Sequence, residues 1–418
     1  MPLKAITNKI KYIILILSCV CLLVVLLCVS ITQPPKLPRD GIQESKLLSP
    51  PPTLSTTSGR GNGVAGNCGK ADGWNYEISA RGSHAVAIKT DGSLWAWGSN
   101  RAGQLGDGTF ADHSIPVKIM DSAAFVSTSE SRTMAIKTDG SLWAWGDNSY
   151  GQVGDGTFVN RNIPVKVLDS VASVSAGEFH TMALKTDGSL WAWGNNEAGQ
   201  FGGATFIHRN ISEKIMLTQG IVSTKIKRLF SLHRNMPIKI MDSVRSVSAG
   251  EFHTMVIKTD GSLWAWGNSS YGQLAGGTVN MPEKILDSAA SVSAGIFHNM
   301  AIKTDGSLWA WGNNRAGQLG DGTFTDSSIP VKIMDSVASV SVGMFYTMAV
   351  KTDGSLWAWG SNNFGQVGDG TFVTRNIPVK ILDSATSISA GTSYAMAIKT
   401  DGSLWAWGRG DGLLDMCE

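Results

Sequence analysis

Residues 89–98 read Lys-Thr-Asp-Gly-Ser-Leu-Trp-Ala-Trp-Gly, and the same ten residues return six more times along the chain. The Asp-Gly pairs begin at Asp91, Asp139, Asp187, Asp260, Asp305, Asp353 and Asp401, at intervals of 48, 48, 73, 45, 48 and 48 residues. A period of this length, built from strand-like segments, is typical of a β-propeller and not of a helical solenoid. Seven copies therefore predict an all-β fold, a seven-bladed propeller.

The third copy shows the strands expected in one blade. Residues 173–177, 181–185 and 190–193 are predicted as three short strands, and Ile-Pro-Val-Lys-Ile supplies an outer fourth strand in most copies. Proline has no amide donor, which suits an edge strand. Asp187-Gly188 predicts a two-residue type I′ hairpin turn between the second and third strands. Each blade is thus expected to be a four-stranded sheet.

The tryptophans are predicted to be core residues. Fourteen of the fifteen lie in the repeated Leu-Trp-Ala-Trp segment, which has no polar side. Neighbouring blades cover both faces of each sheet in a propeller, so residues of both parities are expected to be buried.

The ends of the chain are expected to close the ring. Seven hairpins are present but only six outer strands, centred on Pro116, Pro164, Pro237, Pro282, Pro330 and Pro378. The last blade lacks its own outer strand, so residues 64–73 are predicted to supply it. This arrangement brings Cys68 and Cys417 to one blade, and we predict a disulfide between them. A loop of this length would lower the entropy of the unfolded chain considerably in the chain-entropy description of disulfides.

The N-terminal part is expected to export and tether the propeller. Residues 1–11 are basic, 12–31 are apolar or small over a length that can span a bilayer, and 32–66 are rich in Pro, Ser, Thr and Gly. We interpret them as a cytoplasmic N-terminus, a transmembrane signal anchor and a disordered linker, followed by a propeller over 67–418. A cleaved signal peptide, which gives a secreted protein, and a lipoprotein site at Cys19 are the alternatives. All three place the propeller outside the cytoplasm.

Composition and motifs favour a protein that is not an enzyme. A net charge of +2 over 418 residues does not favour nucleic-acid binding. The Gly-Gln-Leu-Gly-Asp-Gly segments lack the lysine of a phosphate-binding loop, and no nucleophile–base–acid set stands out. Four of the seven repeats carry a histidine at the same position, namely His84, His180, His253 and His298. They are predicted to bond to local loops and not to a metal, and no cofactor is expected.

The repeats vary mainly at one set of loops. Strand direction places the Gly-x-x-His and Gly-Gln-x-Gly loops on one face and the Asp-Gly hairpins with the Asp-Ser turns on the other. The first face carries acidic and aromatic residues, and aromatic residues ringed around an axis are typical of protein-binding hot spots. The predicted partner-binding residues are Glu178, Phe179, Glu251, Phe252, Phe297, Phe345, Tyr346 and Tyr394. The alternative is that each phenylalanine packs under its own loop.

The repeat resembles that of the regulator of chromosome condensation family. The shared pattern is Ala-Gly-x-x-His-Thr-x-Ala-x-Lys-x-Asp-Gly-x-Leu-Trp-x-Trp-Gly, followed by Asn-x-x-Gly-Gln-x-Gly, over residues 78–412. The resemblance implies a seven-bladed propeller whose members differ in function. They include a guanine-nucleotide exchange factor, an ultraviolet receptor and a secreted inhibitor of β-lactamases. Gly177-Glu178-Phe179-His180-Thr181 lacks the receptor's tryptophan, which argues against light sensing.

One basic insert interrupts the period between the third and fourth hairpins, at about 211–235. It could contact a partner, or it could be a degenerate duplication, since 208–210 and 233–235 both read His-Arg-Asn.

Two classes of function remain from the sequence. The first is a monomeric, non-enzymatic recognition propeller that is exported or membrane-tethered and binds a protein through its variable loops. Inhibition of an exported hydrolase such as a β-lactamase is a special case of it. The second is a guanine-nucleotide exchange factor for a small GTPase.

Overall fold

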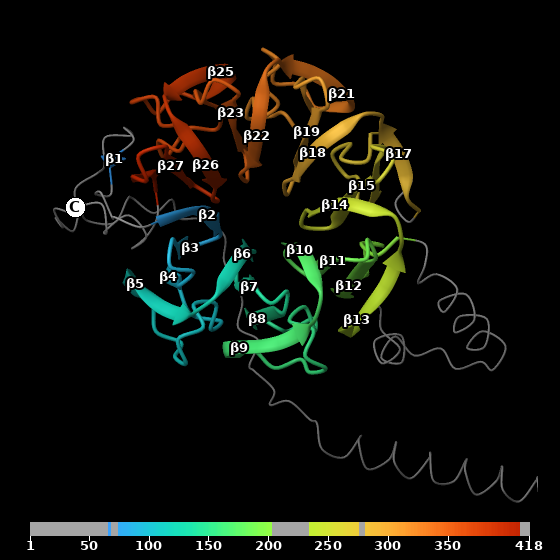
Figure 1. Ribbon diagram of the computed structural model, residues 1–418. Helices are drawn as coiled ribbons and strands as arrows, with labels where there is room; N and C mark the ends of the chain where they lie inside the picture. Colours follow the sequence, from blue (N-terminus) through green and yellow to red (C-terminus); the bar gives the residue numbers. More distant parts are fainter. Residues whose placement is uncertain (1–65, 68–73, 203–233, 276–280, 410–418) are drawn as a thin grey trace, which may run out of the picture. The chain divides into compact units, whose positions relative to one another are not determined.

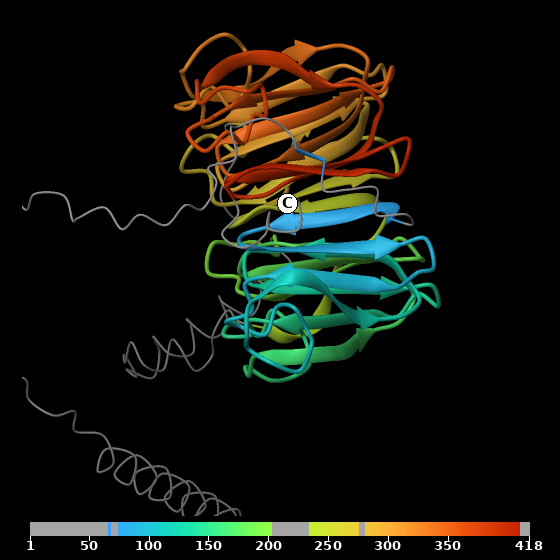
Figure 2. The ribbon, with the colours of Figure 1, turned by 90° about the vertical axis from the view of Figure 1, so that its left-hand side faces the viewer.

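Seven antiparallel sheets surround a common axis (Figure 1). The computed structural model describes residues 66–67, 74–202, 234–275 and 281–409. Within these residues each sheet has four strands, which confirms the predicted all-β, seven-bladed fold. Viewed from the side, the strands run from one face of the ring to the other (Figure 2).

The strand bounds repeat from blade to blade. Blade 1 consists of β2 (Trp74–Arg81), β3 (His84–Lys89), β4 (Leu94–Gly98) and β5 (His113–Met120). Blade 2 consists of β6 (Ala123–Thr128), β7 (Arg132–Lys137), β8 (Leu142–Gly146) and β9 (Arg161–Leu168). Blade 3 consists of β10 (Val171–Ala176), β11 (His180–Lys185), β12 (Leu190–Gly194) and β13 (Arg234–Met241). Blade 4 consists of β14 (Val244–Ala249), β15 (His253–Lys258), β16 (Leu263–Gly267) and β17 (Glu283–Leu286).

The remaining blades follow the same order until the ring closes. Blade 5 consists of β18 (Ala289–Ala294), β19 (His298–Lys303), β20 (Leu308–Gly312) and β21 (Ser327–Met334). Blade 6 consists of β22 (Val337–Val342), β23 (Tyr346–Lys351), β24 (Leu356–Gly360) and β25 (Arg375–Leu382). Blade 7 consists of β26 (Ala385–Ala390), β27 (Tyr394–Lys399), β28 (Leu404–Gly408) and the N-terminal strand β1 (Gly66–Asn67).

Ring closure occurs as predicted. β1 pairs antiparallel with β28, with Gly66 opposite Ala406 and Asn67 opposite Trp405. Blades 7 and 1 also bond directly, because the Ala80 amide donates to Ser389 Oγ at 2.8 Å. Cys68 and Cys417 lie outside the described residues, so their disulfide stays a prediction.

The N-terminal segments and most of the insert also lie outside the described residues. The predicted tail, the anchor and all of the predicted linker except Gly66 fall within 1–65, whereas Gly66 belongs to β1. The described part of the chain contains no helix that is long and apolar enough to span a membrane. β13 begins at Arg234, so the last two residues of the predicted insert belong to the outer strand of blade 3. There the Asn235 side-chain amide donates to Gly156 O of blade 2.

The hairpin between the second and third strands differs from the predicted type I′ turn. In blade 3 the Gly188 amide bonds to Lys185 O at 3.0 Å, and only Gly188, not Asp187, has positive φ. This is a three-residue loop, in which a type I turn is followed by a left-handed glycine. The prediction failed because the Asp-Gly pair serves both turn types. Asp187 stays right-handed since its Oδ1 accepts the Ser189 amide and hydroxyl.

The two tryptophans of each Leu-Trp-Ala-Trp segment have different environments. The second, such as Trp193, is fully buried and donates from Nε1 to the carbonyl of Gln152 in the preceding blade. The first, such as Trp191, is partly exposed; it lies under the Lys185 ammonium and donates to Ser189 Oγ. Leu190 and Ala192 on one side of the strand and Trp193 on the other are buried, which confirms burial of both parities. Trp191 is the exception: it packs against the core cluster shared by blades 2 and 3 but stays partly exposed.

Candidate recognition face

The two faces of the ring carry different connections, as predicted. Tyr150, from the Gly-rich connection of blade 2, makes an edge contact with Phe179, from the first connection of blade 3. We call this side the loop face. On the opposite side, the Val171 amide after the Asp-Ser turn bonds to Gly140 O at a hairpin tip. We call that side the hairpin face.

Three equivalent positions in the first connection of each blade build the loop face. The axial position, nearest the centre of the ring, holds Gly82, Glu130, Glu178, Glu251, Ile296, Met344 and Thr392. The outer position holds Ser83, Ser131, Phe179, Phe252, Phe297, Phe345 and Ser393. The seam position, which follows the outer one, holds His84, Arg132, His180, His253, His298, Tyr346 and Tyr394.

The seam position lies beneath the loop face and joins each blade to the next. His180 is buried, and its Nε2 lies 3.0 Å from Thr254 Oγ1 of blade 4. That hydroxyl donates to Gln200 O, so the imidazole nitrogen must be the donor in its own bond. The histidines therefore bridge blades, and the prediction of bonds within a local loop is wrong.

Burial keeps these imidazoles neutral. It lowers the pKa of His180 and His298 to about 3 and the pKa of His84 and His253 to about 4. Within the described residues no three His, Cys, Asp or Glu side chains are grouped so that they could hold a metal ion. The histidines thus have a structural task that requires no metal.

Tyr346 and Tyr394 also belong to the seam and not to the accessible surface. Both are buried, Tyr346 donates its hydroxyl proton to the carbonyl of Tyr394, and Tyr394 donates to His84 O at 2.8 Å. A partner cannot reach these side chains while the blades stay packed. We therefore exclude them from the candidate recognition residues.

The seam shows a size rule across neighbouring blades. Where a histidine stands, the next blade offers a Thr or Asn side chain; where a tyrosine stands, the next blade has Ala395 or Ala85. The longer tyrosine reaches past the alanine to a backbone carbonyl. This pairing could have been found in the sequence by aligning each repeat with its successor.

The predicted phenylalanines form stacked pairs across blade boundaries. Phe179 stacks on Phe252 with ring centroids 5.2 Å apart, and Phe297 stacks on Phe345 at 5.0 Å. Phe252 has 37% of its surface exposed, and the others are partly buried. The rings contact one another and Tyr150 and Tyr271 of the Gly-rich connections, so they do not simply pack under their own loops.

A groove opens between blades 5 and 6 beside the second stack. Its volume is about 410 Å³, and its lining includes Tyr271, Phe297, Arg315 and Phe345. The Arg315 guanidinium carbon lies 5.9 Å from the Tyr271 ring centroid, and its Nε lies 3.5 Å from Asp326 Oδ2. Three aromatic rings beside polar groups are what a side-chain anchor site offers.

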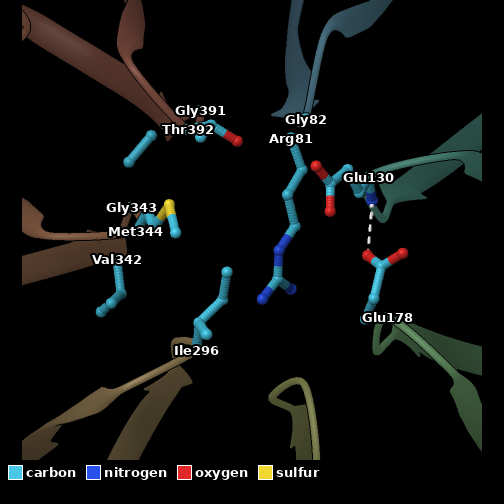
Figure 3. Close-up of a pocket in the computed structure, with 11 residues that line it drawn as sticks. Arg81, Gly82, Glu130, Glu178, Ile296, Val342, Gly343, Met344, Gly391 and Thr392 are labelled. Carbon is cyan, nitrogen blue, oxygen red and sulfur yellow. Dashed lines mark hydrogen bonds between the residues drawn. The ribbon is translucent and has the colours of Figure 1, made fainter. Parts of the chain in front are cut away.

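A smaller pocket of about 50 Å³, which we call the mouth, lies at the centre of the ring on the loop face (Figure 3). Arg81 extends across it from blade 1, and its Nη1 lies 3.5 Å from Ala176 O of blade 3. Glu130 and Glu178 line one side, where the Glu130 amide donates to Glu178 Oε2 at 3.0 Å. Ile296, Val342 and Met344 line the other side and carry no charge.

At this pocket, burial and the neighbouring charges have opposite effects on the pKa of Arg81. Burial lowers the pKa of Arg81, whereas Glu178, Glu251 and Glu130 raise it. Burial raises the pKa of Glu178 and of Glu251, and their mutual repulsion adds to the rise at Glu251. Arg132 lies below, bound to the carbonyls of Gly177, Glu178 and His180. Three carboxylates and two guanidinium groups leave one formal negative charge.

The sequence-based prediction missed Arg81, Tyr271 and Arg315. Arg81 stands where five of the other blades have glycine, so the departure from the repeat was its signal. Tyr271 and Arg315 lie in the Gly-rich connections, where Tyr150 and Tyr271 replace Ala102 and Ala198 of the preceding blades.

These features define a seven-bladed repeat propeller with one uniform and one diversified face. The chain belongs to the RCC1-like domain family, whose model matches residues 64–327, and models of the regulator of chromosome condensation (RCC1) repeat match 305–350, 353–398 and 337–366. This confirms the family resemblance inferred from the repeated motif. A search of curated proteins finds no match.

Solved structures support the fold. Prp20p of Saccharomyces cerevisiae, described with its binding properties to Gsp1p and histones, is 20% identical, with a TM-score of 0.63 over 80% of this chain and 82% of that chain. Human WBSCR16 is 18% identical, with a TM-score of 0.63 over 81% of this chain and 87% of that chain. At this identity the likeness concerns the fold.

Proposed function

We propose that this protein is a non-enzymatic recognition propeller that binds a protein partner through its loop face. The supporting observation is the contrast between the faces: the hairpin tips repeat seven times unchanged, while the loop face carries different residues in each blade. The candidate contact residues are Glu178, Phe179, Glu251, Phe252, Phe297 and Phe345. Aromatic anchors beside a groove and a charged pocket are typical of protein interfaces.

We further propose that residues 12–31 tether the propeller outside the cytoplasm. The support is the apolar stretch with lysines before it, together with the two cysteines that lie outside that stretch, near the ends of the propeller. Protease digestion of the body in intact cells, beside a count of thiols in the non-reduced protein, tests this placement. Protection of the body together with two reactive thiols would overturn it.

The recognition function is tested by crosslinking in the native cells. The variant Phe297→Ser with Phe345→Ser places at both outer positions the residue found in blades 1, 2 and 7, so it should fold normally. The control Thr304→Ala lies at the exposed hairpin tip of blade 5. The wild type and the control should give the same crosslinked protein, and the double variant should lose it. Equal crosslinking by all three chains contradicts recognition through this face.

Nucleotide exchange is the competing function. It is favoured by the family membership and by the similarity to Prp20p, which is described with its binding to Gsp1p. Release of labelled GDP from a crosslinked GTPase, accelerated by the propeller, would establish it. A partner without nucleotide would leave recognition as the function.

A further inference from the structure

The loop face has two adjoining halves with different chemistry. Blades 2 and 3 line the mouth with Glu130 and Glu178, and Glu251 of blade 4 lies close enough to act electrostatically on Arg81. Blades 5 to 7 line it with Ile296, Met344 and Thr392. The groove between blades 5 and 6 lies outward of the uncharged half, and its lining combines three aromatic rings with polar side chains that include Arg315. Ile296 precedes Phe297 in the chain and Met344 precedes Phe345, so mouth and groove share two loops and lie one residue, about 3.8 Å, apart along them.

The acidic half already holds a cation. Arg81 comes from blade 1 and lies across the mouth toward blade 3, within the field of all three glutamates (Figure 3). Its hydrogen bond to Ala176 O is long, at 3.5 Å. Of the other blades, five have glycine at this position and one has Ser129, so the arginine is not needed to form the connection. Arg81 is therefore a guanidinium placed where a partner's cation could also be held.

The charge at the mouth is not balanced by this arginine. Arg132 is committed to three backbone carbonyls below. With all three carboxyls ionised, the two arginines leave one formal negative charge, and an added cation would favour that ionised state against the burial that raises the pKa of Glu178 and Glu251. In a site of reduced dielectric an added cation is attracted, and an added anion is repelled. The groove beside it is lined by three aromatic rings and suits a large apolar side chain.

Resting on the function proposed above, we propose that the partner presents a basic segment to this face: a lysine or arginine enters the mouth beside Glu178 and Glu251, and a neighbouring aromatic or long aliphatic side chain fills the groove at Phe297 and Phe345. Arg81 then acts as an internal competitor. It occupies the mouth in the absence of a partner and weakens binding of the partner's cation by repulsion.

The test uses synthetic peptides and the full chain in a neutral detergent. The probe is an acetylated hexapeptide of alternating Trp and Lys, and the comparison peptide has Glu in place of Lys. Isothermal titration should show binding of the basic peptide and none of the acidic one. Glu178→Gln with Glu251→Gln should weaken binding of the basic peptide by about tenfold or more, as expected when partly buried carboxylates that face a bound cation are lost. Phe297→Ser should weaken it as well.

Arg81→Gly separates this proposal from general charge attraction. The substitution introduces glycine, the residue that blades 3 to 7 have at this position, so the connection should still form. It removes the competing cation and opens the mouth, and the basic peptide should bind several-fold more tightly. The control Thr304→Ala should bind as the wild type does. No binding of the basic peptide at millimolar concentration, stronger binding of the acidic peptide, or weaker binding by Arg81→Gly overturns the inference.

The proposed function can survive that failure. If crosslinking still requires Phe297 and Phe345, but the crosslinked segment of the partner is acidic, or Arg81→Gly weakens the complex, recognition through the loop face stands and the basic segment is wrong. If crosslinking does not depend on the loop face, both proposals fail.

Discussion

The hairpin face and the loop face are built by the same seven repeats, yet they have diverged to different extents. Every hairpin tip reads Lys-Thr-Asp-Gly-Ser, and in each blade the serine hydroxyl donates to the aspartate while the first tryptophan donates to the serine. On the loop face the axial position alone holds five residue types. The repeated bonds that shape a blade lie at the hairpin tips, in the seams and at the asparagines of the Gly-rich connections, where an Asn Oδ1 accepts the amide five residues on. The axial and outer positions of the loop face lie outside this set and can vary without loss of the fold.

The largest expected effect on stability comes from the two tryptophans of one strand, of which Trp193 lies toward the seam and Trp191 toward the hairpin face. Trp193→Ala should lower the free energy of unfolding by about 3–5 kcal/mol, because it empties a fully buried site and leaves the Gln152 carbonyl without its indole donor. Trp191→Ala should cost clearly less, since that ring is partly exposed under Lys185. Urea unfolding followed by circular dichroism measures both. Equal losses would show that the hairpin side carries as much of the core as the seam.

The next effect concerns a glycine of the loop face. A Cβ at Gly177 would lie 2.7 Å from His180 Nδ1 and 2.7 Å from Gly250 O of the next blade. Gly177→Ser should therefore cost about 1–3 kcal/mol, the usual range for overpacking. Blade 2 has Ser129 with Arg132 at the matching positions, so adding His180→Arg should recover part of that loss.

A double-mutant cycle in urea measures this coupling. The control is Gly188→Ala at the hairpin tip, where the nearest atom would be 3.7 Å away but φ is +79°. Its cost should arise from the backbone alone and show no coupling to His180→Arg. Additive losses at Gly177 and His180 would mean that the seam does not select these residues together.

Sequence-based prediction succeeded for most features that repeat in every blade and failed for contacts between residues of different blades. The blades, the ring closure and the assignment of loops to faces could be predicted, because a repeat shows which positions are held constant. The histidine bridges could not, since the partner of His180 is Thr254, 74 residues away in the next blade. The hairpin type was wrong because Asp-Gly suits two turns. Arg81 was missed because its importance depends on three glutamates that come from different blades.

Acid should affect the seam before it affects the hairpin tips. The pKa of His180 is about 3 in the fold and about 6.5 in the unfolded chain, so the unfolded state binds more protons between these values. The stability is thus lost progressively as the pH falls from 6.5 toward 3, and His84, His253 and His298 act in the same direction. In His180→Gln, which keeps a donor for Thr254, the loss of melting temperature over this range should be smaller. An unchanged slope would show that His180 titrates normally.

The hairpin aspartates should act in a lower pH range. Bonds from Ser189 to Asp187 lower the pKa of that carboxyl below its ordinary 3.8, and the six other tips repeat the arrangement. The contribution is present above the unfolded pKa and is lost as the pH falls through the folded one. Asp187→Asn should leave the melting temperature between pH 6.5 and 5 with its wild-type slope and reduce the slope as the pH falls from about 5 through the unfolded pKa of 3.8. A change above pH 5 would mean that the two faces are electrostatically coupled.

The smallest expected effect lies in the Asp-Ser turns of the hairpin face. Six serines, including Ser170 with φ of 59°, adopt the left-handed conformation that glycine tolerates best. Ser170→Gly should relieve this strain, partly offset by the greater entropy of glycine in the unfolded chain, and should change stability by less than about 1 kcal/mol in the favourable direction. Ser173→Gly within β10 is the matched control and should destabilise by about 0.5–1 kcal/mol. Within the described residues, every serine with positive φ lies in one of these turns of the hairpin face. A loss of stability in Ser170→Gly would therefore mean that the serine side chain, and not the backbone conformation, gives this face its uniform shape.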